Sequence, residues 1–176
     1  MKNKKRNTWP IIVTILAFFI SLLFSFISES IMPSVPILIG IIILITFILI
    51  GIIFDMIGVA VTSSNEEPLH AMSSKKIKGA KKAVSFKKNA DKVSSFCNDV
   101  IGDICGVLSG SISASIALKI TASFGISFNI QFLISALVAS LTVSGKAIGK
   151  TIAQKSATKI VHAVAVVLNK LHLNQK

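Results

Sequence analysis

The chain has 176 residues, of which 52% are hydrophobic and 15% are charged, yet its formal net charge is +12 at pH 7. The apolar and basic residues are segregated into long blocks, whereas a soluble basic protein spaces its apolar residues with an amphipathic period. This segregation excludes a soluble nucleic-acid-binding protein and predicts an all-α membrane protein with about four transmembrane helices.

The first predicted element is an apolar run at residues 10–28, which follows the basic residues Lys2, Lys4, Lys5 and Arg6. At ~1.5 Å per residue the run is long enough to cross roughly 30 Å of hydrocarbon. It is longer than a signal-peptide core and no small-x-small cleavage site follows it, so we interpret it as a retained helix. A second span is predicted over about residues 36–62.

The third and fourth spans are predicted over about residues 94–118 and 126–146. Small residues recur in both, with stripes made of Gly102, Gly106, Gly110 and Ala114 in the third span and of Ala136, Ser140 and Ser144, followed by Gly145 and Gly149, in the fourth. Small residues let transmembrane helices approach closely. We therefore expect these two helices to pack through their stripes.

Two basic segments flank the last two spans. In the connector Ser63–Lys92 apolar residues alternate with lysines, which is typical of a helix lying in the membrane interface. The tail 150–176 carries apolar residues at helical spacing and predicts an amphipathic C-terminal helix. Each lysine near an anionic cytoplasmic leaflet gains roughly 1 kcal/mol. The lysines therefore bind this leaflet, fix the topology, or do both.

Charge also predicts orientation, because lysine and arginine are retained on the cytoplasmic side of a membrane. With four spans, the N-terminus, the connector and the tail fall on one side, and Lys119 is left alone on the other. We expect a multi-pass protein of the cell membrane with cytoplasmic N- and C-termini.

Several polar residues fall within or at the ends of the predicted spans: Asp55, Asn98, Asp99, Asp103 and Lys146. An ionisable residue in a membrane usually faces a partner or a wet cavity, because its exposure to lipid is costly. Oxygen ligands of this kind suit a hard cation such as Mg²⁺ or Na⁺. The alternatives are a closed ion-pair network with Lys146, or carboxylates that simply sit at the membrane surface.

The order of these motifs resembles the transmembrane domain of the CNNM/CorC family of magnesium transporters. The likeness rests on Asp55-Met-Ile-Gly-Val-Ala-Val, on Cys97-Asn98-Asp99, and on the string that begins with Gly145-Lys-Ala-Ile-Gly-Lys150, and it covers about residues 37–172. It divides the chain into residues 1–36, a basic cytoplasmic stub plus an extra transmembrane helix, and residues 37–176, a CNNM-like domain with juxtamembrane helices.

The resemblance implies a Mg²⁺ site between the spans. Asp55 falls where the family has its first serine, Asn98 and Asp99 where it has asparagines, and Lys146 where it has a glutamate. The chain departs from the family at Lys146, whose ammonium repels a cation by about 4 kcal/mol per unit charge at 4 Å and an effective dielectric near 20. Gly149 also replaces a proline, and the sequence contains no CBS domain.

Two hypotheses follow. The first is a divalent-cation transporter that forms a homodimer, with Asp55, Asn98, Asp99 and Asp103 along the path of Mg²⁺ and Lys146 as a counter-charge. The second is a non-transporting scaffold or regulatory subunit in which Lys146 pairs with Asp99 or Asp55 in place of the cation.

An enzyme is not expected, because the three histidines, His70, His162 and His172, have no nucleophile or metal-ligand spacing around them.

Overall fold

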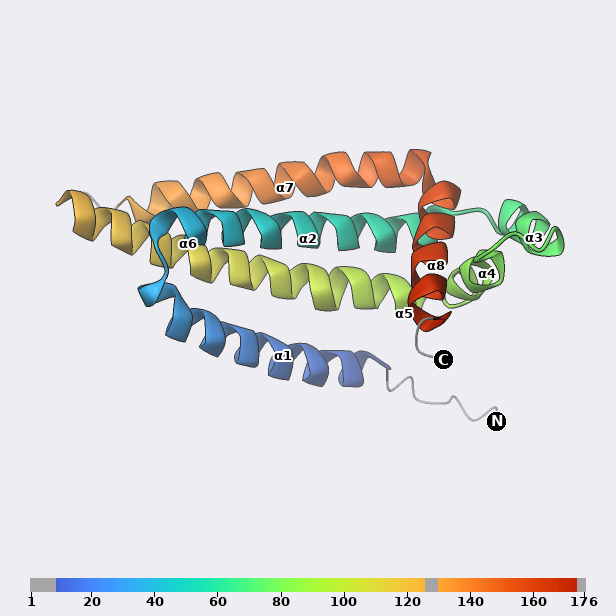
Figure 1. Ribbon diagram of the computed structural model, residues 1–176, viewed down its shortest axis with the longest axis horizontal. Coiled ribbons are helices and arrows are strands. Elements are labelled where there is room, and N and C mark those ends of the chain that lie inside the picture. Colours follow the sequence, from blue (N-terminus) through green and yellow to red (C-terminus); the bar gives the residue numbers. More distant parts are fainter. Residues whose placement is uncertain (1–8, 126–129, 174–176) are drawn as a thin grey trace, which may run out of the picture.

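The chain forms an all-α membrane protein (Figure 1). The computed structural model describes residues 9–125 and 130–173, which form no strand. The helices are Trp9–Ile31 (α1), Met32–Ser34 (η1), Ile37–Ser63 (α2), Glu66–Ser74 (α3), Ala80–Lys88 (α4), Ala90–Ser95 (α5), the π-helical Phe96–Gly102 (η2), Asp103–Phe124 (α6), Gln131–Lys155 (α7) and Ala157–Leu173 (α8). The N-terminal basic residues and the expected start of the fourth span at residue 126 lie outside the described part.

Within the described residues, four helical segments are long and apolar enough to cross a membrane, as the sequence predicts: Ile11–Ser34, Ile37–Ser63, Ala90–Phe124 and Gln131–Lys155. Two boundaries differ from the prediction. The third segment is a rod of 35 residues made of α5, η2 and α6. The fourth runs on to Lys155, so that Lys146 and Lys150 lie inside a helix and not at its end.

Helix α2 is the centre of the bundle. It contacts α6 and α7 along its length and η2, α5 and α8 near its C-terminal end (Figure 1). One face of α2 is buried and consists largely of small residues, namely Gly40, Leu44, Gly51, Asp55 and Gly58. Close approach of backbones is what stabilises helix pairs in lipid, where apolar side chains gain nothing by leaving the hydrocarbon. The glycine face of α2 therefore positions the other helices.

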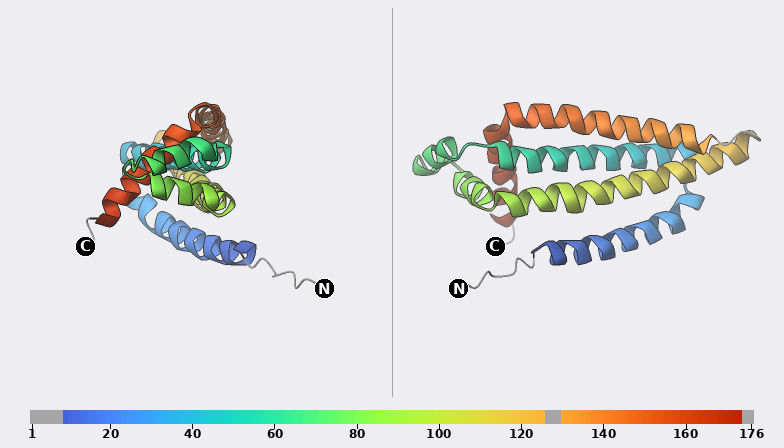
Figure 2. Two further views of the ribbon diagram at one scale, coloured as in Figure 1. Left: turned by 90° about the vertical axis from the view of Figure 1, so that its right-hand side faces the viewer. Right: turned by 180° about the vertical axis from the view of Figure 1, so that it is seen from behind.

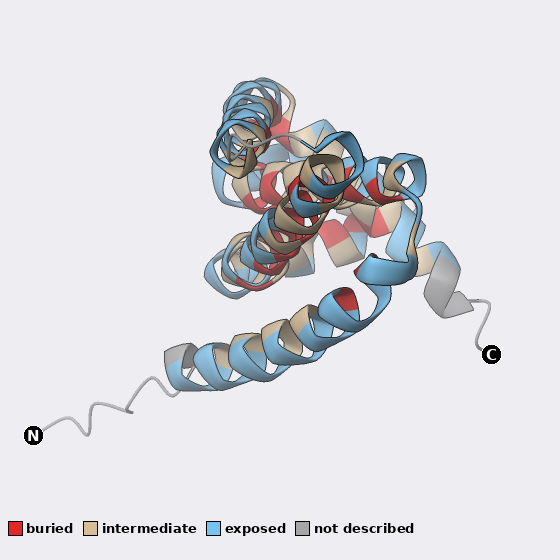
Figure 3. Cartoon of the chain, turned by 90° about the vertical axis from the view of Figure 1, so that its left-hand side faces the viewer, coloured by how far each residue is buried: buried red, intermediate tan, exposed pale blue. Residues whose placement is uncertain are grey.

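Helix α1 lies at the edge of the bundle (Figure 2). It contacts α6, η1 and η2, and its side chains are mostly exposed (Figure 3). Phe18, Phe19 and Phe26, for example, have exposed fractions of 61%, 62% and 70%. In a membrane-spanning helix such residues face lipid. Helix α1 is thus a peripheral span of the bundle.

The expected packing of the two small-residue stripes is wrong. Helices α6 and α7 do contact one another, but through larger residues such as Ile112, Ile116 and Val138. Gly106 and Gly110 are exposed, and no described atom outside their own turn lies within 4 Å of a Cβ added at either position.

The stripe on α7 also has a different partner. Ala136, Ser140 and Ser144 are exposed. Gly145 and Gly149 pack against α2 instead, where an added Cβ would overlap Ile52 or lie 2.8 Å from Cγ of Met56. These glycines fit α7 onto the central helix.

The connector and the tail form a separate core at one end of the bundle, which we call the basic end. Helix α8 crosses this end, and α3 and α4 pack beside it (Figure 1). The core consists of Ala60, Val61, Leu69, Ala83, Ala153, Ala157, Val161 and Ala165. The connector is therefore several short helices and not one interfacial helix, and its apolar residues Leu69, Ala80 and Ala83 are buried in protein.

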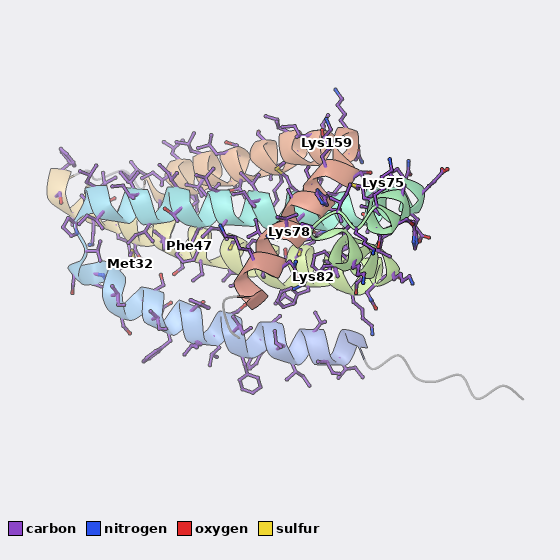
Figure 4. The ribbon with its side chains drawn as sticks, turned by 45° about the vertical axis from the view of Figure 1, so that its right-hand side comes forward. Met32, Phe47, Lys75, Lys78, Lys82 and Lys159 are labelled. Atoms are coloured by element: carbon purple, nitrogen blue, oxygen red, sulfur yellow. The ribbon has the colours of Figure 1, made fainter. Side chains whose placement is uncertain are left out.

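Lysines gather at the basic end, as Lys75, Lys78, Lys82 and Lys159 show in Figure 4, while Met32 lies at the opposite end. Some of them satisfy backbone carbonyls that have no partner within a helix. The ammonium of Lys87 donates to the Thr62 carbonyl at the end of α2, with a distance of 2.8 Å from nitrogen to oxygen. At the opposite end, Lys119 donates to the carbonyl of Val35 in the turn before α2. The two ends of the central helix are thus tied to other helices by lysines.

We predict that Gly79→Ala destabilises the basic end. Gly79 has a φ of +82°, and an added Cβ would lie 3.0 Å from the backbone nitrogen of Val166 in α8. The left-handed conformation alone costs about 1–2 kcal/mol for an alanine. The melting temperature in detergent is measured with a thiol-reactive dye, because Cys97 and Cys105 are free and buried.

The matched control is Gly106→Ala, where the added methyl group enters open space on a regular helix. This variant should melt at the wild-type temperature or slightly above it, because alanine favours a helix over glycine by ~1 kcal/mol. Equal melting temperatures of the two variants would contradict the packing of Gly79 on α8.

Candidate functional site

Asp55 is the one buried acidic residue in the described part of the chain, with an exposed fraction of 5%. It lies on the small-residue face of α2, one turn from Gly51 and one turn from Gly58. A Cβ added at Gly51 would lie 3.1 Å from Cβ of Cys105 and 3.8 Å from the carbonyl oxygen of Gly102. Asp55 therefore faces the π-helical segment and the start of α6.

Lys150 is the ionic partner of Asp55. Its ammonium lies 3.7 Å from Oδ2 of Asp55, and the side chain of Lys150 is 51% exposed. The separation is beyond hydrogen-bonding distance, and Oδ2 accepts no hydrogen bond from the described residues. A buried carboxylate is thus only partly compensated, by a cation that is itself half in solvent.

Asn98 faces the same helix from η2. Its amide contacts Gly58 so closely that a Cβ there would overlap it. Nδ2 donates to the hydroxyl of Ser94 at 3.3 Å, whereas the buried Oδ1 has no hydrogen-bond partner among the described residues. Asn98 thus brings one oxygen without a hydrogen bond to the contact between α2 and η2, and Asp55 carries a second one turn away on the same face of α2.

The π-helical form of this segment is itself informative. A π-helix bonds each N–H to the carbonyl five residues earlier, and such turns inside α-helices occur frequently at functional sites. Here it spans Phe96–Gly102 within an otherwise α-helical rod. The segment predicted from sequence to carry chemistry is thus the one in which the helix departs from regular geometry.

Lys146 approaches the site from α7 without the expected ion pair. Its ammonium lies 3.8 Å from the Cβ position of Gly102 in η2. The ion pair formed by Asp55 is with Lys150, one turn further along α7. The prediction that Lys146 pairs with Asp55 or Asp99 is therefore wrong. Helix α7 continues past the expected end of the span, and this continuation brings Lys150, and not Lys146, to Asp55.

Asp99 and Asp103 do not join Asp55. Both are exposed, and Asp99 accepts a hydrogen bond of 2.6 Å from the hydroxyl of Ser95. Among the residues that the structure describes, no group of three His, Cys, Asp or Glu side chains is placed to hold a metal ion. The single acidic cluster expected along a cation path is therefore reduced to Asp55 and the amide of Asn98.

Sequence reasoning missed Lys150 and the glycine face of α2. Lys150 was placed in the tail because the fourth span was predicted to end near residue 146, whereas α7 continues to Lys155. The spacing Gly51, Asp55 and Gly58 places three residues on one helix face, and this signal would have shown that Asp55 points into the bundle.

No protein-family model, no curated protein and no solved structure matches the chain.

Proposed function

We propose that the chain is a membrane protein that binds and transports a divalent cation, with Mg²⁺ as its substrate, at a site centred on Asp55 and Asn98. The observation that carries this proposal is the pair of buried oxygens, Oδ2 of Asp55 and Oδ1 of Asn98, that accept no hydrogen bond from the described residues. A buried oxygen that accepts no hydrogen bond is costly. A cation at the α2–η2 contact would satisfy both.

The chemistry of the two groups suits this ion. Mg²⁺ prefers oxygen ligands and keeps several waters, so that one or two carboxylates suffice to hold it. The motif resemblance implies the same ion and places Asp55 and Asn98 at two of its positions. In this proposal the ammonium of Lys150, at 3.7 Å from Asp55, is a counter-charge that the incoming cation displaces.

A second candidate function is a non-transporting scaffold or regulatory subunit. It is favoured by the same ion pair, because Lys150 already partly compensates Asp55, and by Lys146, whose ammonium lies beside Gly102. In this case two lysines of α7 take the place of the cation permanently. The homodimer also stays a prediction.

The proposed site predicts Mg²⁺-dependent stability and flux. In vesicles containing a Mg²⁺-sensitive dye, the wild type should carry Mg²⁺, and Asp55→Asn should abolish the flux. In detergent, Mg²⁺ at tenfold its dissociation constant should stabilise the wild type by roughly 1.4 kcal/mol, measured as a shift in melting temperature. Asp55→Asn removes the charge but keeps the shape, so the shift should disappear.

Asp103→Asn is the matched control, because Asp103 is exposed and lies outside the site. It should keep both the flux and the Mg²⁺-dependent shift. Loss of both signals in Asp103→Asn, or their persistence in Asp55→Asn, would rule out the proposed site.

The two candidate functions differ in what they predict for Lys150→Met. If Lys150 is a displaceable counter-charge, its removal should tighten Mg²⁺ binding by about tenfold, which corresponds to ~1.4 kcal/mol. If it is a permanent partner, its removal should leave Mg²⁺ without effect and destabilise the fold by about 1–2 kcal/mol, a value reduced for the exposure of Lys150. Titration of the melting temperature with Mg²⁺ separates these outcomes, and Lys155→Met, at an exposed position of the same helix, serves as control.

We also propose that the basic end faces the cytoplasm of the cell, with both termini on that side, because lysines are retained there. Single cysteines at Lys75 and at Ser34, each in a background that lacks Cys97 and Cys105, test this orientation; both positions are exposed. In intact cells a membrane-impermeant maleimide should label Ser34→Cys, and it should label Lys75→Cys only after permeabilisation. The opposite pattern would reverse the topology.

A further inference from the structure

An apolar pocket of about 400 Å³ lies where the bundle meets the basic end. Its walls come from four parts of the chain and include Phe54, Ile57, Phe86, Phe96, Val164 and Leu168. The volume falls within the roughly 300–1,000 Å³ that small-molecule sites occupy. Because its lining is almost entirely apolar, the pocket suits a hydrocarbon and offers little to a water-soluble ligand.

The position of the pocket along α2 places it at the edge of the membrane. Phe54 and Ile57 precede the end of this helix at Ser63 by about 9–14 Å at ~1.5 Å per residue. The short helix α3, whose charged residues are Glu66 and Glu67, follows, and the lysine-rich segment from Lys75 to Lys88, which includes α4, comes after it. A ligand in the pocket therefore lies at the depth of lipid chains, within reach of the region that lipid headgroups occupy.

Cationic groups border the pocket on the side of α4 and α8. Lys82 lies one turn from Phe86 on α4, and its ammonium is 3.4 Å from the carbonyl oxygen of Leu168, a residue of the pocket wall. Lys82 also lines a neighbouring hollow of about 480 Å³ together with Lys76, Lys81 and Asn169. No Asp or Glu is among the described residues that line either space. Lys92 lines the apolar pocket itself, and Lys82 joins the cationic hollow to the pocket through its contact with the Leu168 carbonyl.

We infer that this pair of spaces binds one anionic glycerophospholipid of the surrounding leaflet. An acyl chain fills the apolar pocket, and the phosphate lies against Lys82 and the neighbouring hollow. Figure 4 shows Lys82 beside α8, at the same end of the molecule as the other labelled lysines. The lipid would join α4 and α8 to the bundle. This inference goes beyond the proposed transport and does not depend on it.

The test measures lipid retention by native mass spectrometry. The purified chain is exchanged into mild detergent with equal amounts of phosphatidylglycerol and phosphatidylcholine of the same chain length. The wild type should retain one lipid, with phosphatidylglycerol in excess. Since each lysine near an anionic headgroup contributes a factor of about five, Lys82→Gln should lower the preference for phosphatidylglycerol by about fivefold.

Matched variants separate the pocket from the rest of the surface. Val164→Phe fills the apolar pocket and should abolish lipid retention, whereas Val167→Phe, at an exposed position of the same helix, should retain lipid as the wild type does. Lys75→Gln controls for Lys82→Gln, because Lys75 is exposed and lines neither space. If Val164→Phe does not fold, Leu168→Trp tests the same wall, and the melting temperature identifies the folded variants.

Two results would overturn the inference. One is equal retention of the two lipids by the wild type, which would mean that the lysines do not select an anionic headgroup. The other is unchanged lipid retention in folded pocket-filling variants, which would place the bound lipid elsewhere. Loss of Mg²⁺ flux in Asp55→Asn with retention of phosphatidylglycerol would leave the lipid site intact and separate it from the transport site.

Discussion

The close approach of helices to the glycine face of α2 is the constraint on which the rest of the structure depends. In a bilayer the hydrophobic effect does not drive helices together, so contact requires surfaces on which backbones can meet. Gly51 and Gly58 supply this surface toward η2 and α6, and Gly145 and Gly149 supply it from α7. The close packing of helices on this face also buries Asp55, which lies between Gly51 and Gly58.

The basic end follows a different rule. Its core is built mainly from alanines, so that α8 lies close against the ends of α2 and α7. Lysines at its surface have two roles. Lys87 satisfies a carbonyl at the end of α2, and Lys82 contacts a carbonyl of α8. Retention of lysines on the cytoplasmic side would by itself account for the positive charge of the basic end. Lys82 and Lys87 also stabilise the junction between this end and the bundle.

The number of spans and their order were predictable from the sequence, because the length of an apolar run directly reflects the thickness of a bilayer. The partners of the glycines were not predictable. A stripe such as Gly106 and Gly110 shows that close approach is possible on that face, but it does not identify the helix, if any, that approaches. The burial of Asp55 was also not predicted, because it depends on which face of α2 points into the bundle. Its pairing with Lys150 depends on the continuation of α7 beyond Gly149.

The π-helical segment also decides which side chain meets α2. A wider turn accommodates one more residue than an α-turn, and one residue corresponds to a rotation of about 100° around a helix axis. With α6 held fixed, a regular helix through Phe96–Gly102 would turn Asp99 into the place that Asn98 occupies against Gly58. A second negative charge would then approach Asp55. The π-helical segment thus presents the neutral amide of Asn98 to the face of α2 that carries Asp55, and it leaves Asp99 exposed.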